Sequence, residues 1–379
     1  MLFAILAMAI AAVGLTVHAL TVVLVLLQAR RGTGTRPGPD AAGGVSIVRT
    51  VRDLDPLEEM TLRSSFLIDY PSYEVIFCAQ SEHDPAVPLV RRLIAEHPGV
   101  PARLLVGDDR VSANPKLNNM VKGWRAAEHP GVVFADSNLL LPRDYLSRLL
   151  SAWTPDCGLV SAPPIGSRPG SFWAEVECAM LNTYQARWQY AASSVGFGFA
   201  QGKTLMFRRG VVNLGPDLRG LSADLAEDAA ATKAVRAAGL KVRLAGPSLF
   251  QPLGPRSWRS VLARQRRWAM LRCAAFPRLY ALEPLSGAVV PAAALVTGMI
   301  MLDGPVAVAL AGFAVSWLAA EAALARGAGW HLSRWFPLAW LVRETVMPLI
   351  WASAILARDF RWRGNSIATH PALKDRTAP

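Results

Sequence analysis

The sequence predicts an α/β domain with a mostly parallel, doubly wound sheet, flanked by apolar segments at both ends of the chain. Between residues 45 and 135, apolar strands alternate with helical stretches, a pattern typical of right-handed βαβ crossovers. Residues 2–27 form a nearly unbroken apolar run, and apolar segments return after Ser286. Hydrophobic residues make up 52% of the 379 residues and charged residues only 18%. This balance excludes a disordered chain and favours a folded domain with membrane-buried segments.

The amino-terminal apolar run predicts an uncleaved transmembrane anchor over residues 1–28, since a helix of this length spans the hydrocarbon core. A cleaved signal peptide is the alternative. A signal peptide carries positive charge before its apolar run, whereas Arg30, Arg31 and Arg36 follow this one. The same asymmetry places the downstream domain in the cytoplasm. Residues 29–44, rich in glycine and proline, are predicted to form a linker.

The α/β domain is predicted to cover residues 45–255. The expected strands are 45–51, 73–79, 102–106 and 131–135. The expected helices are 56–66, 88–96 and 117–127. Ligands of such sheets bind beyond the carboxyl ends of the strands, so we look for functional residues there.

The carboxyl-terminal part is predicted to contain a basic interfacial region over 256–284, a membrane region over 285–360 and a polar tail over 361–379. Three membrane segments are expected in it, at 286–302, 305–325 and 336–357. Proline and charged residues interrupt them, which favours a broken, tilted or re-entrant segment. Alternation of spans from a cytoplasmic domain places the tail outside, whereas its arginines favour the inside, and both alternatives stay open.

The net charge of +12 favours a phosphate-bearing substrate or an anionic lipid surface as partner, because the apolar runs argue against a nucleic-acid-binding protein. The four cysteines are widely spaced without a CxxC pair, so we expect neither a zinc site nor a disulfide framework. No obligate protein partner is indicated.

Three aspartates lie where predicted strands meet loops or open a helix. Asp84 follows the second strand, Asp136 ends the fourth, and Asp228 follows Glu227 at the start of a helix. A carboxylate at the end of a buried strand is costly unless it binds a metal or a hydrogen-bond donor. For each one alone, a helix cap or surface turn is an equally good interpretation.

A basic motif, Arg264-Gln-Arg-Arg-Trp268, lies downstream. Arg264 and Arg267 are three residues apart, on one helical face, with Trp268 beside them. Arginines so placed can grip phosphate oxygens, and the indole can stack or anchor at an interface. A basic helix resting on anionic headgroups is the alternative.

With these motifs the chain resembles the ceramide glucosyltransferase family, glycosyltransferase family 21. The family signature of three aspartates followed by (Q/R)xxRW falls on Asp84, Asp136, Asp228 and Arg264/Arg267/Trp268. Further agreement lies in IDYPSYEV (68–75), NPKLNN (114–119) and LAED (225–228), and the resemblance covers nearly the whole chain.

The resemblance implies a GT-A fold and a UDP-sugar donor. Asp84 is expected to contact the uridine, while Asp136 and Asn138, from a degenerate DxD, hold a divalent cation (Mn²⁺ or Mg²⁺) and the diphosphate. Lys116 of the NPK motif adds a positive charge there, with a solvated turn lysine as the alternative. The remaining expected donor-binding residues are Asn118, Arg264, Arg267 and Trp268.

The resemblance also implies an inverting transfer of glucose from UDP-glucose to the primary hydroxyl of ceramide, giving glucosylceramide. Asp228 is then the general base and Glu227 its rival. Trp268, Arg343 and Glu344 are expected at the lipid acceptor, because ionisable residues within an apolar segment mark a functional interior. A purely structural ion pair is the alternative for Arg343 and Glu344.

Several departures and rivals bear on these expectations. The Ser-Glu-His run before Asp84 is less acidic than in animal relatives, and Gln185 stands where those relatives have histidine, so sugar or lipid choice could differ. A hopanoid-lipid N-acetylglucosaminyltransferase using UDP-GlcNAc is the main alternative. Gly202-Lys-Thr204 resembles a P-loop end but lacks the upstream glycine, which argues against an NTPase. The composition suggests a bacterial inner-membrane protein with a cytoplasmic catalytic domain.

Overall fold

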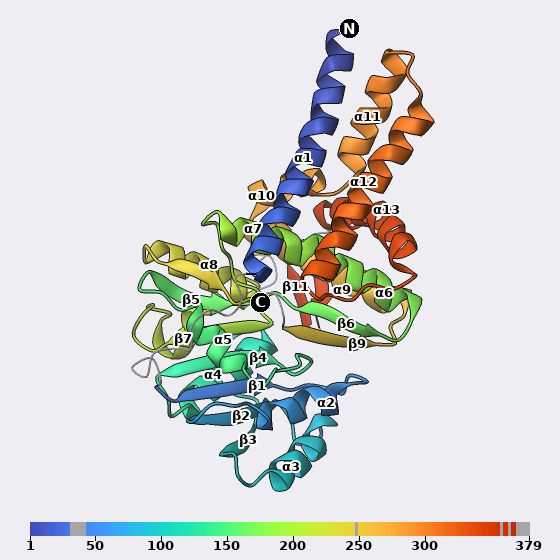
Figure 1. Ribbon diagram of the computed structural model, residues 1–379. Helices are drawn as coiled ribbons and strands as arrows, with labels where there is room; N and C mark the ends of the chain where they lie inside the picture. Colours follow the sequence, from blue (N-terminus) through green and yellow to red (C-terminus); the bar gives the residue numbers. More distant parts are fainter. Residues whose placement is uncertain (31–42, 247–248, 357–358, 363–364, 369–379) are drawn as a thin grey trace. The chain divides into compact units, whose positions relative to one another are not determined.

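The computed structural model describes residues 1–30, 43–246, 249–356, 359–362 and 365–368 (Figure 1). Most of the expected linker and of the polar tail lies outside these residues. The chain forms two compact units. The sheet unit consists of residues 28–168 and 192–254, and the helical unit of residues 1–27, 169–191 and the chain from 255 onward.

The sheet unit is built on seven strands in the order β3-β2-β1-β4-β7-β5-β8 (Figure 1). Strands β1 to β4 run parallel to their neighbours in this half of the sheet, and β5 pairs with β8 in parallel. Their bounds are β1 Val45–Thr50, β2 Tyr73–Ala79, β3 Ala102–Val106, β4 Gly131–Asp136, β5 Cys157–Ser161, β7 Thr204–Arg208 and β8 Lys241–Leu244. A separate ribbon joins β6 (Ile165–Pro169) to β9 (Phe250–Gly254).

Helices cover both faces of this sheet because side chains alternate between the two faces of a strand. On one face, Ile76 and Cys78 pack with residues of α4 and α8. On the other, Val75 and Phe77 pack with α2 and α3, and Val133 packs with α5. The helices are α2 Glu58–Arg63, α3 Ala86–Glu96, α4 Pro115–Ala126, α5 Tyr145–Ser151 and α8 Glu227–Ala237, with 3-10 turns at Ser64–Phe66 and Pro216–Ala223.

The sequence-based expectations for the first half of the sheet are confirmed, with helix ends shifted by a few residues. Strand β7 was not expected. It lies between β4 and β5 and runs antiparallel to both, so the sheet is mixed. The pairing places Thr204 opposite Ala135, and the Asp136 N–H donates to the Lys203 carbonyl at 3.1 Å. This strand therefore brings the Gly202-Lys203 turn to the end of β4.

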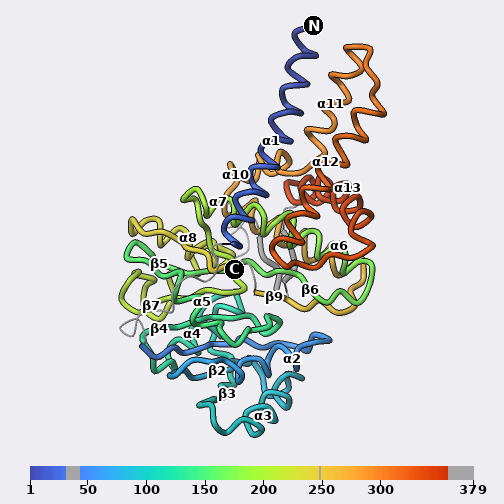
Figure 2. Tube along the Cα trace, in the orientation of Figure 1, coloured from blue at the N-terminus to red at the C-terminus, as the bar shows by residue number. Residues whose placement is uncertain are grey.

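The helical unit contains the apolar segments (Figures 1 and 2). Its elements are α1 Leu2–Arg30, α6 Phe172–Ala179, the π-helical turn Met180–Ala186, α7 Arg187–Ser194, α9 Trp258–Ala275, α10 Pro277–Ala281, the turn Glu283–Ser286, α11 Val289–Met301, α12 Val306–Gly327 and α13 Phe336–Ile355. A short hairpin pairs β10 (Asp359–Trp362) with β11 (Asn365–Ala368).

Helices α1, α11 and α12 lie side by side, and Ala11, Leu295 and Phe313 pack in their shared core. Within the described residues, three helices are long and apolar enough to cross a membrane, namely α1, α12 and α13. Helix α11 has only 13 residues, which at 1.5 Å per residue is about 20 Å, shorter than the hydrocarbon core. These helices associate the protein with a membrane.

Candidate active site

Asp136, the last residue of β4, carries a carboxylate that two lysines bracket. Its Oδ1 lies 2.9 Å from Lys116 Nζ, and its Oδ2 lies 2.8 Å from Lys203 Nζ. Burial alone would raise the pKa of Asp136, but the two ammonium groups outweigh burial and hold this pKa well below its usual range. Asp136 is therefore ionised at any physiological pH.

Lys116 is positioned by the amino-terminal cap of α4. The Asn114 side chain accepts hydrogen bonds from the N–H groups of Lys116 and Leu117, and Pro115 occupies the first helical position. From there, Lys116 Nζ also reaches Glu227 Oε1 at 2.7 Å and donates to the Gly202 carbonyl at 2.6 Å. Burial lowers the pKa of Lys116, but the neighbouring carboxylates raise it above its ordinary value overall. The ammonium thus stays charged between two carboxylates.

Glu227 and Asp228 open α8 but have different partners. Glu227 faces Lys116 and also accepts a hydrogen bond from Asn114 Nδ2 at 3.0 Å. The Asp228 carboxylate accepts from the N–H groups of Gly202 and Ala229, both at 2.8 Å. Burial, together with the nearby negative charge of Glu227, raises the pKa of Asp228 to about 6. A carboxylate with this pKa suits a base that accepts a proton near neutral pH.

Gly202 lets the backbone approach this cluster closely. A Cβ built there would lie 3.0 Å from Glu227 Oε1, 3.1 Å from Lys116 Nζ and 3.3 Å from Asp228 Oδ2. A side chain there would require these polar groups to shift by a few tenths of an ångström. Glycine therefore favours this close approach through its small size, since its conformation is not left-handed.

Arg49 holds the loop that follows Asp136. This arginine is fully buried in β1 and donates hydrogen bonds to the carbonyls of Ser137 at 2.8 Å and Leu139 at 3.0 Å. It also donates to Ser65 Oγ at 3.0 Å. Asn138, in the same loop, accepts from Lys203 Nζ at 2.9 Å through Oδ1. Arg49 thus fixes the loop that presents Asn138.

Two further expected residues bind loops rather than the lysine cluster. The Asp84 carboxylate accepts from the N–H groups of Asp53 and Ala86, joining the ends of β1 and β2. Asn118 Oδ1 accepts from the N–H groups of Val111 and Ser112. In the described residues, neither side chain hydrogen-bonds to the Lys116–Asp136 cluster.

The RxxRW motif lies on α9 in the helical unit. Arg264 Nη1 donates to Glu177 Oε1 at 2.7 Å, and this glutamate is completely buried. Arg267 and Trp268 are half-buried on the same helix. The buried Glu177 carboxylate therefore neutralises the charge of Arg264 within the protein.

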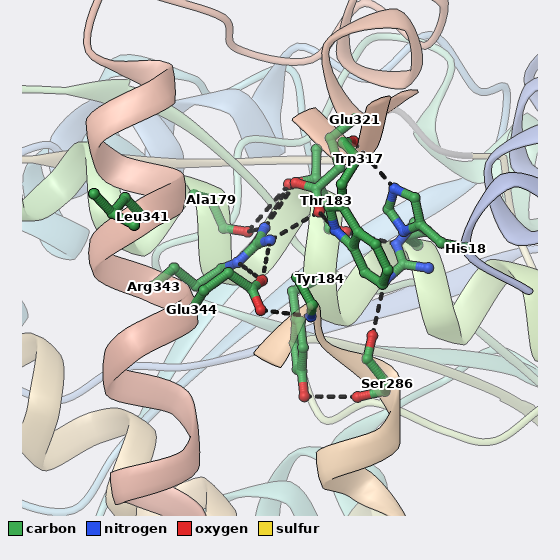
Figure 3. A network of polar contacts seen from close by, with 12 residues as sticks. His18, Ala179, Thr183, Tyr184, Ser286, Trp317, Glu321, Leu341, Arg343 and Glu344 are labelled. Carbon is green, nitrogen blue, oxygen red and sulfur yellow. Dashed lines mark hydrogen bonds and ion pairs between the residues drawn. The ribbon is translucent and has the colours of Figure 1, made fainter. Parts of the chain in front are cut away.

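Arg343 and Glu344 belong to a buried network between helices (Figure 3). The Arg343 guanidinium donates to both carboxylate oxygens of Glu321 at 2.8 Å and to Thr183 Oγ1 at 2.8 Å. Glu344 accepts from Arg343 and, at 2.7 Å, from the Ala288 N–H before α11. His18 stacks on Trp317 in the same region, with ring centroids 3.8 Å apart. This network ties α12, α13 and the π-helical turn together.

A cavity opens in the helical unit beside this network. The residues that line it include the charged Arg272, Glu283 and Glu344 and the apolar Met347, Ile350 and Trp351. Arg272 and Glu283 form an ion pair at 2.6 Å. The cavity thus combines charged and apolar lining residues.

The two oxygens expected to bind a divalent cation both contact the ammonium group of Lys203. Asp136 Oδ2 and Asn138 Oδ1 lie 2.8 and 2.9 Å from the same Lys203 Nζ. The described residues contain no group of three or more His, Cys, Asp or Glu that could hold a metal ion. One carboxylate and one amide oxygen still fit a hard cation that takes its other ligands from phosphates and water.

The sequence profile of glycosyl transferase family 21 matches residues 3–373. The chain belongs to glycosyltransferase family 21. The resemblance drawn from the aspartates and the RxxRW motif is thereby confirmed. Membership of this family makes the chain a sugar-transferring enzyme.

Relatives agree with this assignment to family 21. Ceramide glucosyltransferase 1 of Caenorhabditis elegans is 28% identical over 330 residues, which cover 85% of this chain and 71% of the relative. Ceramide glucosyltransferase of Komagataella phaffii is 39% identical over 122 residues, 31% of this chain and 24% of the relative. A mannosyltransferase from Pyrobaculum calidifontis, solved with GDP-Man and Mn²⁺, superposes with a TM-score of 0.51 at 20% identity over 92% of this chain and 98% of its own. This likeness confirms the GT-A fold.

Sequence reasoning missed four residues that shape the two units: Arg49, Glu177, Gly202 and Lys203. In the sequence, Gly202-Lys203 resembles only a fragment of a P-loop. Its position beside Asp136 depends on the pairing of β4 with β7, about 70 residues later in the chain, and no local pattern reports such a pairing.

Proposed function

We propose that this family 21 enzyme transfers glucose from UDP-glucose to the primary hydroxyl of ceramide, with inversion at the anomeric carbon. The observation that carries the proposal is the Asp228 carboxylate. It is held by two backbone N–H groups, and burial and Glu227 raise its pKa to about 6, beside the charged Lys116–Asp136 pair. The names of the C. elegans and K. phaffii relatives support glucose and ceramide as substrates.

In the proposed reaction, Asp228 accepts the proton of the acceptor hydroxyl while that oxygen forms a bond to C1 of the sugar. The bond between C1 and the diphosphate oxygen breaks, and the electron pair leaves with UDP. One in-line displacement of this kind inverts the anomeric centre. The hydrogen bonds from Gly202 and Ala229 orient the carboxylate for this step.

The donor diphosphate is proposed to bind at the end of β4. Lys116 supplies a positive charge that stays in place, and Asp136 and Asn138 would hold a divalent cation, Mn²⁺ or Mg²⁺. Such a cation neutralises charge on the leaving diphosphate. Asp84 and Asn118 are proposed to shape the nucleotide-binding loops, and Arg264, Arg267 and Trp268 to contribute to donor binding.

The acceptor is proposed to bind in the helical unit. The cavity lined by Glu344 and Trp351 offers charged groups for the ceramide headgroup and an apolar wall for its chains. Arg343 would act there by holding Glu344, and Trp268 by its place on α9. We place the enzyme in a bacterial inner membrane with the sheet unit in the cytoplasm, because the arginines follow the first apolar helix.

A substrate panel tests this proposal. The purified full chain in detergent micelles is incubated with UDP-glucose, UDP-galactose, UDP-glucuronic acid or UDP-GlcNAc, each with ceramide, a hopanoid lipid or diacylglycerol, and products are identified by mass spectrometry. We expect glucosylceramide as the main product. A product formed only from UDP-GlcNAc and the hopanoid lipid would replace the proposal with the alternative.

A further inference from the structure

Lys203 is the charged residue at the end of β4 that the proposed reaction does not use. Its side chain is only 11% exposed. Its ammonium group bonds to Asp136 Oδ2 at 2.8 Å and to Asn138 Oδ1 at 2.9 Å. These are the two oxygens that suit a divalent cation, so the lysine occupies the position where that cation would bind.

The ammonium and a divalent cation exclude each other at this position. Like charges within a few ångströms of each other repel, and a divalent ion doubles the repulsion that a single positive charge would cause. The amide oxygen of Asn138 and the Oδ2 of Asp136 also cannot serve both cations at short distance. Lys203 must therefore leave before a metal ion can bind there.

A displaced Lys203 needs another anion, because an unpaired ammonium in a buried site is costly. The nearby Glu227 is already bonded to Lys116 and Asn114, and Asp228 to two backbone N–H groups. A nucleoside diphosphate brings negative phosphate oxygens to the same place. It is the anion that can receive the lysine as the metal arrives.

We propose that Lys203 is a built-in counter-ion that occupies the cation position between Asp136 and Asn138 until a metal–nucleotide diphosphate complex displaces it. This inference rests on the proposed donor site. Its consequence is that the metal binds weakly without the nucleotide, and that the lysine, once displaced, pairs with the diphosphate. Lys203 thereby couples cation binding to donor binding.

The test measures Mn²⁺ binding directly, by the electron paramagnetic resonance signal of free Mn²⁺, with the full chain in detergent and no nucleotide present. Lys203→Met removes the charge and keeps an unbranched side chain of similar length. We expect this variant to bind Mn²⁺ at least about tenfold more tightly than the wild type, because the competing charge is gone. Adding UDP should then tighten Mn²⁺ binding less in the variant than in the wild type.

Two controls accompany this variant. Lys203→Arg keeps the charge and should bind Mn²⁺ as weakly as the wild type. Lys241→Met removes a half-exposed lysine of β8 that pairs with Asp156, and it should leave Mn²⁺ binding unchanged. Thermal melting reports whether each variant is folded, and Lys203→Gln takes the place of Lys203→Met if the latter does not fold.

The proposal is overturned if the uncharged variant binds Mn²⁺ within twofold of the wild type or more weakly, or if neither binds it at all. It is also overturned if Lys203→Arg binds as tightly as Lys203→Met. Because this measurement needs neither sugar nor lipid, its result is independent of the product panel. Tighter Mn²⁺ binding in Lys203→Met, with no glucosylceramide from the wild type, would keep this proposal and reject the substrate assignment.

Discussion

At the scale of single residues, the adjacent carboxylates Glu227 and Asp228 differ in their hydrogen-bond and ion-pair partners, and these partners determine which role each carboxylate can take. Glu227 is bonded to an ammonium and an amide, whereas Asp228 accepts hydrogen bonds from two backbone N–H groups. The first is a structural counter-charge for Lys116, and the second keeps a carboxylate suited to accept a proton. The sequence alone favoured Asp228 only through its family pattern.

Asp228→Asn should therefore lose most turnover while it keeps its affinity for UDP. Removing a general base costs about 10²–10⁴ in rate. Turnover is measured with UDP-glucose and ceramide, and UDP affinity by calorimetry. The matched control is Asp224→Asn. Asp224 lies just before α8 and pairs with Lys233 within this helix, so the variant should keep near-normal turnover. Near-normal turnover in Asp228→Asn would remove this residue from its role.

The pH dependence of the rate should also report Asp228. Burial and the Glu227 charge raise the pKa of Asp228 to about 6. The base works only when deprotonated, so kcat should fall as the pH drops through about 6 and level off above it. Glu227→Gln removes the neighbouring negative charge and should move this acid limb to lower pH. An acid limb that stays in place in Glu227→Gln would contradict the coupling between the two carboxylates.

At the scale of elements, local periodicity was enough to predict β1 to β4 and the helices between them, since each shows its own apolar pattern. Strand β7 was not predicted, because its place between β4 and β5 is set by long-range antiparallel pairing. The same dependence on long-range pairing limits the prediction of the candidate site. Motifs identify Asp136, Lys116 and Asp228, whereas the position of Lys203 and Gly202 beside them follows only from the pairing of β7 with β4.

Arg49 links an element to the site, because it fixes the loop after β4 from within β1. Arg49→Met should leave the carbonyls of Ser137 and Leu139 without their buried donor. Each buried group left unsatisfied costs about 1–3 kcal/mol, so we expect a loss of about 3 kcal/mol in the free energy of unfolding. Denaturant unfolding measures this. Arg52→Met, a change at a less buried arginine just after β1, should cost under about 1 kcal/mol. Equal losses in both variants would argue against the loop-fixing role.

At the scale of the whole molecule, the chain consists of a sheet unit with the carboxylates proposed to react and a helical unit with the apolar segments. From composition and periodicity, the sequence predicted an α/β fold with apolar helices near both ends of the chain. It expected three carboxyl-terminal membrane segments, of which α11 is short, and it did not predict that residues 169–191 belong to the helical unit. The Arg343 network explains why residues 169–191 belong to the helical unit, because Thr183 of this segment accepts a hydrogen bond from Arg343.

Arg343→Met should destabilise the helical unit strongly. It leaves the buried carboxylates of Glu321 and Glu344 without their shared partner (Figure 3). Breaking a buried ion pair costs about 3–5 kcal/mol. Thermal melting of the full chain in detergent should show a clear drop in Tm, and the exposed Arg334→Met should not. Unchanged melting in Arg343→Met would mean that the network does not hold these helices together.

The proposed function predicts one stereochemical outcome, because a single proposed base in the sheet unit acts in one displacement on a lipid proposed to bind in the helical unit. The decisive measurement is the anomeric configuration of the glycolipid made by the full chain from UDP-glucose, whose glucose is α-linked, and ceramide, determined by proton NMR of the purified product. The account predicts β-glucosylceramide. An α-linked product, or no transfer of glucose to ceramide, would contradict it.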